Sequence, residues 1–545
     1  MKTFIIASIT CSSFFIACTN NPSDPSNGTV SSKTEKKISS RDRSIDKTNS
    51  YSDLFLDSAA VENFIAEKKT ADSFAYRIRS FYSSRNYQFA WFSSNGLTEQ
   101  ARGFWNLHDY VTTYDADSSL KDKALQKKMD RLIAEEELSV NESDKSFLNT
   151  ELTLTKHFIQ YMLHNYEKGY VKRKEMERFV PAKKADALLL ADSLINKKHK
   201  DDKYFEDVNQ SYKGLKEQLN KYYTVAKQGG WPSIELPKKS LKKGITSPSV
   251  ALIKKRLLLS NDLPVNDTSQ LFNDTLELAV KNFQLRHGYK PTGIISDSLV
   301  KEMNVPAIKR LQQILMNMDR MRWISNTSSG NLIVVNIPEF VLHLYENNRK
   351  VFDMDVVVGK EGHNTMMFNG DLNQVVFSPY WNVPESIVKN EILPAIERNP
   401  NYLNSQNMEI TGNDDDGLPV IRQLPGTKNS LGKVKFLFPN SFNIYFHDTP
   451  SKSLFNKDQR AYSHGCIRLK EPEKMANYVL RNQPEWTPGK IEEAMNSSEQ
   501  KFVKVKDPIP VVITYYTAWV DENGQLNFRK DIYGHDGNLA SKMFL

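Results

Sequence analysis

Apolar residues recur every three to four positions between residues 51 and 243, which predicts a mostly helical region. The pattern is clearest in the range 148–166. Ser143 or Asp144 can cap the start of this helix, and Gly169 can end it. The polar residues of the region follow no pattern that indicates chemistry. We therefore interpret residues 51–243 as a helical scaffold domain.

Residues 244–306 predict a compact unit of three short helices, with turns at His287-Gly288 and Thr292-Gly293. The apolar faces of its first two helices comprise Val250, Leu252, Ile253 and Leu257, and then Leu276, Ala279, Val280 and Phe283. The stretch 279–284, followed by Gly293-Ile294, resembles the small peptidoglycan-binding domain, which implies contact with glycan. Thr292-Gly293 stands where that family has Asp-Gly, and a purely structural unit is the alternative. Residues 307–330 are predicted to be a helical linker.

From residue 331 the period of the apolar positions changes to two, which predicts β-strands separated by Asn, Gly and Pro clusters. The predicted strands are 332–337, 340–345, 351–358, 374–377, 434–438, 442–447 and 510–516. They indicate a sandwich or an irregular barrel, with a helical insertion at 384–398 and a helix at 472–481. We therefore expect a multidomain α+β protein in which residues 331–545 form a mostly-β domain.

The first 17 residues have the layout of a secretory signal peptide, because Lys2 precedes an apolar run that is too short to span a bilayer. Phe15-Ile16-Ala17-Cys18 resembles the lipobox of bacterial lipoproteins, which implies cleavage before Cys18 and lipidation of its thiol. Cys11 is the rival lipidation site, and an ordinary signal peptide is the alternative. Residues 18–50 hold almost no aliphatic side chains and are predicted to form a disordered tether.

The chain of 545 residues carries 73 basic and 65 acidic side chains, giving a formal net charge of +8. Because the basic residues are spread along the chain, we do not expect nucleic acid as a partner. With Cys11 removed and Cys18 lipidated, Cys466 is the one remaining thiol of the three cysteines. A lone thiol in an oxidising compartment calls for a chemical reason, so Cys466 is the candidate nucleophile.

The groups that such a nucleophile needs lie in two stretches, 445–448 and 463–468. A thiol requires a base to react at neutral pH, and His447 is the candidate, placed at the end of one strand with Cys466 at the start of the next. Gly465 lets the backbone turn so that N–H groups can face a developing oxyanion. Arg468 is expected on the same side of its strand as Cys466, where it could hold a carboxylate.

Three other interpretations of these residues were weighed. The two histidines and Cys466 could bind zinc, but their spacing matches no closed structural site. Cys466 could be an inert buried thiol, but its export argues against this interpretation. His464 is better interpreted as a structural histidine than as a catalytic one. We expect neither a metal nor a cofactor.

Taken together, His447-Asp448-Thr449 and Ser463-His464-Gly465-Cys466-Ile467-Arg468 resemble the signature of the L,D-transpeptidase catalytic domain. Flanking stretches agree with this resemblance, including 335–338, 357–360, 382–384, 425–426, 429–432, 438–440 and 517–520. The layout of the regions ahead of it is similar to the large Gram-negative subgroup with a scaffold domain.

The resemblance implies that Cys466 is the nucleophile, that His447 donates and accepts protons, and that the main-chain carbonyl of Asp448 orients His447. Three N–H groups are implied as the oxyanion hole: those of His464, Gly465 and Cys466. Four side chains are expected to contact substrate: Arg468, Ser463, Trp381 and Asn429. A lid is expected near residues 451–460.

The same resemblance implies an enzyme that forms 3-3 cross-links between peptidoglycan stem peptides, from a tetrapeptide donor and an amine acceptor, through a cysteinyl thioester that carbapenems can also form. An L,D-carboxypeptidase, a hydrolase and a lipoprotein-attaching enzyme could use the same thioester. A non-catalytic wall-binding lipoprotein is the alternative of a different class. We expect a periplasmic protein held to a membrane by its lipid, and Thr19 after Cys18 favours the outer membrane.

Overall fold

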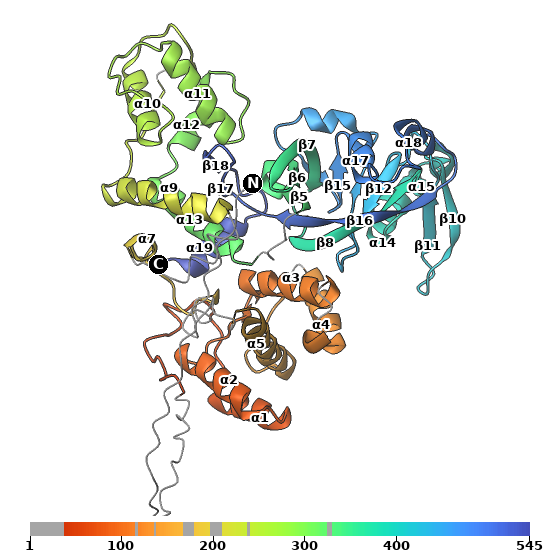
Figure 1. Ribbon diagram of the computed structural model, residues 1–545, viewed down its shortest axis with the longest axis horizontal. Helices are drawn as coiled ribbons and strands as arrows, with labels where there is room; N and C mark the ends of the chain where they lie inside the picture. The colour runs from red at the N-terminus through yellow and green to blue at the C-terminus, as the bar shows by residue number, and fades with distance from the viewer. Residues whose placement is uncertain are drawn as a thin grey trace, which may run out of the picture. The chain divides into compact units, whose positions relative to one another are not determined.

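The computed structural model describes residues 38–114, 118–135, 138–166, 179–196, 210–236, 240–323 and 330–545 (Figure 1). Contacts divide the chain into residues 1–37 and a second unit, 38–545, which holds all of the described residues. The expected signal peptide and Cys18 lie outside them. No helix among the described residues is long and apolar enough to cross a bilayer. The expected multidomain α+β class is confirmed.

The helical region is built largely from capped amphipathic helices. Its elements are α1 (Ser58–Glu67), α2 (Asp72–Ser84), β1 (Phe92–Ser93), β2 (Gly96–Leu97), α3 (Glu99–Tyr114), η1 (Ser118–Leu120), α4 (Lys123–Ala134), α5 (Lys145–Tyr166), α7 (Ala187–Asn196) and α9 (Gln210–Lys227). Asp57 and Asp122 cap α1 and α4. Asp144 accepts the N–H of Ser146 at 2.7 Å in the first turn of α5, where a cap was expected. The expected end at Gly169 lies outside the described residues.

The core of this region also contains two segments from later in the chain. Helix α13 (Ala307–Met321) is buried over most of its surface, including Leu311, Ile314 and Leu315. The expected helix at 307–330 is present over Ala307–Met321, and residues 324–329 lie outside the described ones. The helix packs into the helical core, because apolar residues occur on several of its sides.

The second segment is the C-terminal tail, residues 515–545, which holds β17 (Ala518–Val520), β18 (Leu526–Phe528) and α19 (His535–Met543). The side chains of the tail that lie in the helical core are Ala518, Trp519, Leu526, Phe528, Leu539, Met543 and Phe544. The expectation that one domain spans 331–545 is corrected accordingly. Strand β16 ends at Thr514, and most of the buried apolar residues beyond it complete the helical core.

The expected tether at 18–50 also needs a correction. Within its described part, Ile45 is 1% exposed, and its carbonyl accepts the side-chain amide of Asn86 at 2.7 Å. Ser50 forms a β-bridge with Lys183. One buried aliphatic residue and main-chain hydrogen bonds therefore order a segment whose composition indicated disorder.

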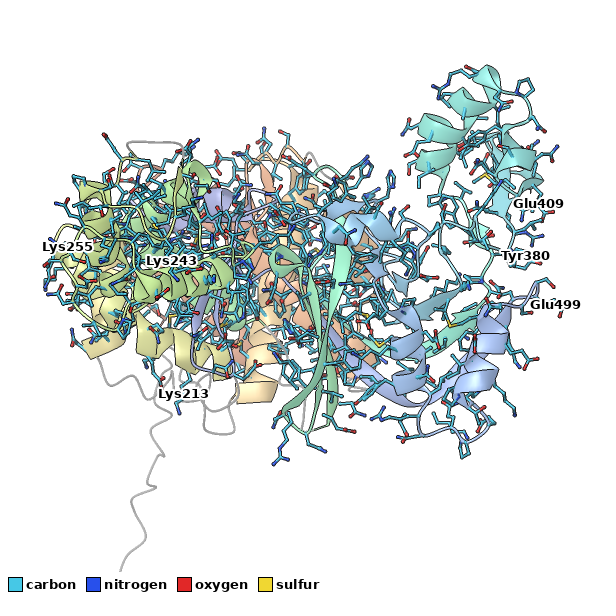
Figure 2. All side chains as sticks on the ribbon, turned by 90° about the horizontal axis from the view of Figure 1, so that it is seen from above. Lys213, Lys243, Lys255, Tyr380, Glu409 and Glu499 are labelled. Atoms are coloured by element: carbon cyan, nitrogen blue, oxygen red, sulfur yellow. The ribbon has the colours of Figure 1, made fainter. Side chains whose placement is uncertain are left out.

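The three-helix unit comprises β3 (Ser240–Leu241), α10 (Pro248–Leu259), α11 (Asp274–Arg286), β4 (Ile295–Ser296) and α12 (Asp297–Met303). Ser247, Asn273 and Ser296 cap its helices. Its apolar residues form a core of their own around Val250, Val280 and Phe283. Lys243 and Lys255 lie on its exposed surface (Figure 2).

The mostly-β domain is a closed barrel. Its elements are β5 (Asn331–Asn336), η2 (Ile337–Glu339), β6 (Val341–Glu346), β7 (Arg349–Gly359), β8 (Phe368–Phe377), β12 (Val434–Leu437), β13 (Phe446–His447), η4 (Lys452–Asn456), β14 (Ala461–Ser463), β15 (Ile467–Leu469), α17 (Pro472–Val479), α18 (Pro488–Met495) and β16 (Lys501–Thr514). The strands follow the order β7-β15-β13-β12-β8-β16-β5-β6, and β6 pairs back with β7. Alternate residues such as Val356 and Val358 point into the core.

An insertion with a small core of its own lies between β8 and β12. It comprises β9 (Trp381–Asn382), α14 (Glu385–Ile387), the π-helical turn η3 (Val388–Ile392), α15 (Leu393–Arg398), α16 (Tyr402–Ser405), β10 (Met408–Asn413) and β11 (Pro419–Gln423). Helix was expected at 384–398, but the β10–β11 hairpin was not. On this hairpin Arg422 pairs with Glu409 and stacks over Tyr380, both labelled in Figure 2.

Candidate active site

Strand pairing brings the two expected catalytic stretches together. Strand β13 lies between β12 and β15, so that His447 pairs with Lys435 on one side and with Arg468 on the other. The neighbouring Phe446 and Ile467 point into the barrel core. Because alternate residues of a strand face opposite sides, His447, Lys435 and Arg468 share the outer face of the sheet. Cys466 directly precedes β15 at this point.

His447 is held in one tautomer. Its side chain is 4% exposed, and its Nδ1 lies 2.5 Å from the main-chain carbonyl of Asp448. Since a carbonyl oxygen only accepts hydrogen bonds, Nδ1 carries the proton. Burial, with a contribution from the charge of Arg468, lowers the pKa of His447 to about 3. The imidazole is therefore neutral near pH 7, with the lone pair of Nε2 free to accept a proton.

Cys466 is half-buried, and its Sγ donates to the carbonyl of Asn443 at 3.7 Å. Burial raises the pKa of this thiol, while hydrogen bonds from Tyr445 and the charges of Arg468 and Lys435 oppose that rise. The resting site thus holds a neutral thiol and a neutral imidazole. Such a pair needs proton transfer to a general base as the sulfur attacks.

The loop before the nucleophile is shaped by Ser463 and Gly465. Gly465 has φ +109°, a conformation that side chains with a Cβ rarely adopt. Ser463 is 2% exposed, and its hydroxyl donates to the carbonyl of Cys466 at 2.5 Å and accepts the N–H of Gly465 at 3.2 Å. The N–H of Gly465 is therefore already occupied, and the hydroxyl of Ser463 shapes the loop.

The other three expected substrate contacts have different surroundings. Asn429 is 1% exposed and bonds to main-chain groups of Pro379 and Leu424, so it holds a loop. Trp381 is half-buried and packs against the small core of the insertion. Arg468 is half-buried beside Cys466, and its Nε has no hydrogen-bond partner among the described residues. Of the four, Arg468 has an unpartnered polar atom beside the nucleophile.

Comparison with known proteins agrees with this geometry. Residues 330–513 match the sequence model of the L,D-transpeptidase catalytic domain, and residues 76–219 match that of a scaffold domain. Residues 330–513 form an L,D-transpeptidase catalytic domain. The matched range ends beside Thr514, where β16 ends and the tail begins.

A relative and two solved structures are also similar to this chain. A candidate L,D-transpeptidase of Haemophilus influenzae is 32% identical over 254 residues, which cover 44% of this chain and 50% of that protein. The chain thus spans about half the length of the curated relative it matches. An L,D-transpeptidase from Mycobacterium smegmatis is 15% identical, with a TM-score of 0.20, over 35% of this chain and 60% of that one. One from Xylanimonas cellulosilytica is 12% identical, with a TM-score of 0.17, over 51% and 99%.

The insertion of the L,D-transpeptidase domain touches the nucleophile loop at a point that the sequence did not indicate. Nε2 of His464 lies 2.9 Å from the carboxylate of Glu391 in η3, and its ring packs edge-on against His363. Burial lowers the pKa of His464, although Glu391 opposes that effect. His464 thus contacts the insertion. A single acidic residue in an expected helix carries no signal that would have revealed this contact.

The segment 451–460, which was expected as a lid, follows Asp448 in the sequence and precedes the nucleophile loop. It forms the short helix η4, and Lys452 reaches back to the Asp448 carboxylate at 2.7 Å. The same carboxylate accepts the N–H of Lys433 at 2.9 Å. Gly432 has φ +62°, and a Cβ there would collide with the Asp448 side chain. Asp448 therefore ties together the segments that flank His447.

Proposed function

We propose that this protein is a peptidoglycan L,D-transpeptidase that forms 3-3 cross-links between stem peptides through a thioester on Cys466. The observation that carries the proposal is the 2.5 Å contact between His447 and the Asp448 carbonyl, on the strand paired with the one that follows Cys466. This contact leaves Nε2 as a base on the face of the sheet that Cys466 adjoins. The match of residues 330–513 supports the same chemistry.

In the first half-reaction, the sulfur of Cys466 attacks the carbonyl of the third residue of a tetrapeptide stem, and Nε2 of His447 takes the thiol proton. The main-chain N–H of Cys466, with that of His464, stabilises the oxyanion of the tetrahedral intermediate. The intermediate then expels the amine of D-Ala, which receives the proton from the imidazolium. The stem stays on Cys466 as a thioester.

In the second half-reaction, the amine on the third residue of a neighbouring stem attacks the thioester and gives its proton to His447. Collapse of that intermediate returns the proton to the departing sulfur, and a new amide joins the two stems. His447 thus acts as base and then acid in each half-reaction. A neutral imidazole and a neutral thiol suit both steps, because the site does not have to break a thiolate–imidazolium ion pair before it reacts.

We further propose that Arg468 and Lys435 bind carboxylates of the donor stem. Both side chains are half-buried on the face that carries His447, and burial lowers the pKa of each. A guanidinium in this position can hold a carboxylate with two parallel hydrogen bonds. This assignment gives a role to the unpartnered Nε of Arg468.

Two measurements test the proposed activity. Intact mass of the folded full-length protein after exposure to a carbapenem should increase by one adduct in the wild type, but not in Cys466→Ala. Purified protein with a tetrapeptide substrate should yield 3-3 dimers, and Lys490→Ala, an exposed change in α18, serves as the matched control. An unchanged mass of folded wild-type protein would contradict the proposal. Tripeptide monomers in place of dimers would point to a carboxypeptidase, and no product to a non-catalytic wall-binding protein.

We also propose that Cys18 carries a lipid that anchors the protein in the periplasm, in the outer membrane, and that the three-helix unit contacts glycan. The lipobox-like Phe15-Ile16-Ala17-Cys18 supports the first point, and the three-helix layout supports the second. Metabolic labelling with a fatty acid should mark the wild type and spare Cys18→Ala. Purified peptidoglycan should pull down less protein when residues 244–306 are removed. An unlabelled wild type, or unchanged pull-down, would contradict the respective point.

A further inference from the structure

The carbonyl of Gly465 is held from outside its own loop. The hydroxyl of Thr365, in the segment between β7 and β8, donates to this carbonyl at 2.8 Å. The same hydroxyl accepts the N–H of Gly359 at 2.9 Å. Thr365 is 2% exposed, so both hydrogen bonds are shielded from water. One buried hydroxyl therefore fixes the peptide group between Gly465 and Cys466.

The direction of this peptide group matters for the chemistry. A trans peptide is planar, and its C=O and N–H point in opposite directions. When Thr365 holds the carbonyl of Gly465, it also aims the N–H of Cys466 the opposite way. That N–H is one of the two oxyanion donors left after Ser463 occupies the N–H of Gly465. Thr365 thus controls the aim of a donor that it does not touch.

Thr365 is in turn held by the C-terminal tail. The hydroxyl of Tyr533 donates to the carbonyl of Gly359 at 2.6 Å and accepts the N–H of Thr365 at 3.3 Å. Tyr533 lies between β18 and α19 and is 8% exposed. Its position is beyond residue 513, where the match to the catalytic domain ends.

Hydrogen bonds continue from Tyr533 into the helical region. The N–H of Tyr533 donates to the hydroxyl of Tyr515 at 2.9 Å, and that hydroxyl donates to Asp531 at 2.7 Å. The other carboxylate oxygen of Asp531 accepts the N–H of Asp536 at 2.8 Å. The side chain of Asp536 pairs with Arg320 of α13 at 2.5 Å. The nucleophile loop is thereby connected to the helical core through side chains and main-chain groups that are largely buried.

We propose that Thr365 and Tyr533 are positioning residues that aim the N–H of Cys466 at the oxyanion, and that the tail makes the helical region part of the catalytic apparatus. This inference rests on the proposed function, because the aim of the amide matters only if Cys466 is acylated. Neither residue has to touch substrate. Their effect is on the stabilisation of the tetrahedral intermediate, not on the reactivity of the thiol.

The test compares Thr365→Val, Thr365→Ser and Tyr533→Phe in the full-length protein. Valine keeps the shape of threonine and removes the hydroxyl, whereas serine restores it. Two rates are measured for each variant by intact mass: acylation of Cys466 by a carbapenem, which needs the oxyanion donors, and alkylation by iodoacetamide, which does not. Thr365→Val should slow acylation by roughly 10- to 100-fold and leave alkylation unchanged. Thr365→Ser should recover most of the lost rate, and Tyr533→Phe should show a smaller loss than Thr365→Val.

A spectroscopic measurement judges the positioning without any activity. Gly465-Cys466 is the one Gly-Cys step in the sequence, so carbonyl-labelled glycine and nitrogen-labelled cysteine give a single correlated amide signal. Loss of the Thr365 hydrogen bond should shift the carbonyl resonance of Gly465 in Thr365→Val and leave it near its original position in Thr365→Ser.

The outcomes separate the two proposals. An unchanged resonance in folded Thr365→Val would overturn the positioning role, as would equal losses in acylation and alkylation. Should Thr365→Val not fold, Tyr533→Phe answers the same question, because it removes one hydroxyl and keeps the ring. A wild type that is alkylated at Cys466 but never acylated would overturn the proposed function, and the resonance would still decide whether Thr365 holds the peptide.

Discussion

The two largest cores of the molecule are assembled in different ways. The barrel core comes from one nearly continuous stretch, 333–515, joined by Ile532 and Tyr533 from farther along the chain. The helical core draws on three separate stretches: residues 51–222, α13 with Trp323, and the tail from Ala518 to Phe544. Local pattern therefore describes most of the barrel, whereas the helical core depends on contacts between distant parts of the chain.

This difference shows where the catalytic domain ends as a physical unit. The matched range stops at residue 513, but the tail beyond it carries both the last part of the helical core and the tyrosine that supports the nucleophile loop. The barrel is thus continuous in sequence but not independent in structure. Four changes test this view, ordered from the largest expected effect to the smallest.

Truncation after Thr514 should prevent the protein from folding. It removes Trp519, Leu526, Phe528, Leu539, Met543 and Phe544, all of them buried in the helical core. Each such side chain contributes roughly 1.5–3 kcal/mol on burial, so together they rival the 5–15 kcal/mol stability typical of a whole domain. Circular dichroism and thermal melting measure the loss, and removal of the exposed Leu545 alone is the control. A truncated chain with a cooperative melt would show that both cores close without the tail.

Arg320→Met should cost about 3–5 kcal/mol in the free energy of unfolding. Arg320 is 5% exposed and pairs with Glu99 at 2.6 Å and with Asp536, so its loss leaves two largely buried carboxylates uncompensated. Lys290→Met is the matched control, because its partner Asp458 and Lys290 itself are both more than 60% exposed, at 63% and 67%. That pair should contribute less than about 1 kcal/mol. Urea unfolding measures the free energy of unfolding of both variants. Equal losses would show that the ion pairs of Arg320 stabilise the protein no more than an exposed ion pair does.

Alkaline pH should weaken the barrel through His343 of β6. Although burial lowers its pKa, hydrogen bonds to Asp353 at 2.7 Å and to Glu339 at 3.1 Å raise the pKa to about 9. A pKa above the unfolded value of about 6.5 gives stability that is fully present below that pH and is lost as the pH rises through about 9. The loss is at most about 3 kcal/mol. Urea unfolding of the wild type and His343→Gln at pH 6 and pH 10 should show a flatter pH dependence for the variant, and parallel curves would refute this assignment.

Gly214→Ala should destabilise the protein by roughly 1–3 kcal/mol, because a Cβ on α9 would lie 2.7 Å from Cβ of Val520 in the tail. Gly489→Ala, in α18 of the barrel domain, is the opposite case, since nothing lies within 4 Å of its Cβ. There alanine should be neutral or stabilise the helix by up to about 1 kcal/mol. Thermal melting distinguishes the two, and a neutral Gly214→Ala would mean that the tail yields easily at this contact.

Much of the barrel was predictable because its strands are short apolar runs, several of them alternating, between Asn, Gly and Pro clusters. The expected ranges 332–337 and 351–358 lie within or close to β5 and β7. The first half of β16 was missed, because Asp507 and Pro508 interrupt the apolar pattern ahead of the expected strand 510–516. The expected strand 442–447 shrinks to Phe446–His447, because Asn440 holds the preceding residues in a turn through four hydrogen bonds.

Some residues of the candidate site were likewise predictable from the sequence, and others were not. Cys466 and His447 were visible because chemistry constrains their residue types and neighbours. Thr365 and Tyr533 were not visible, because a hydroxyl that binds a main-chain carbonyl leaves no motif and its partner lies far away in the sequence. The main-chain hydrogen bonds of Asn429 and Ser463 were not visible for a related reason: a polar residue near a motif can serve the backbone as readily as a ligand.

The main chain and the side chain of Asp448 respond differently to mutation. The oxygen that orients His447 belongs to the main chain, and all twenty amino acids would supply it. A substitution that keeps the main chain in place therefore acts through the carboxylate, which binds the N–H of Lys433 and the amine of Lys452. A library of substitutions at this position would measure how well the loop tolerates a change of side chain. It would not report on the main-chain oxygen that orients His447.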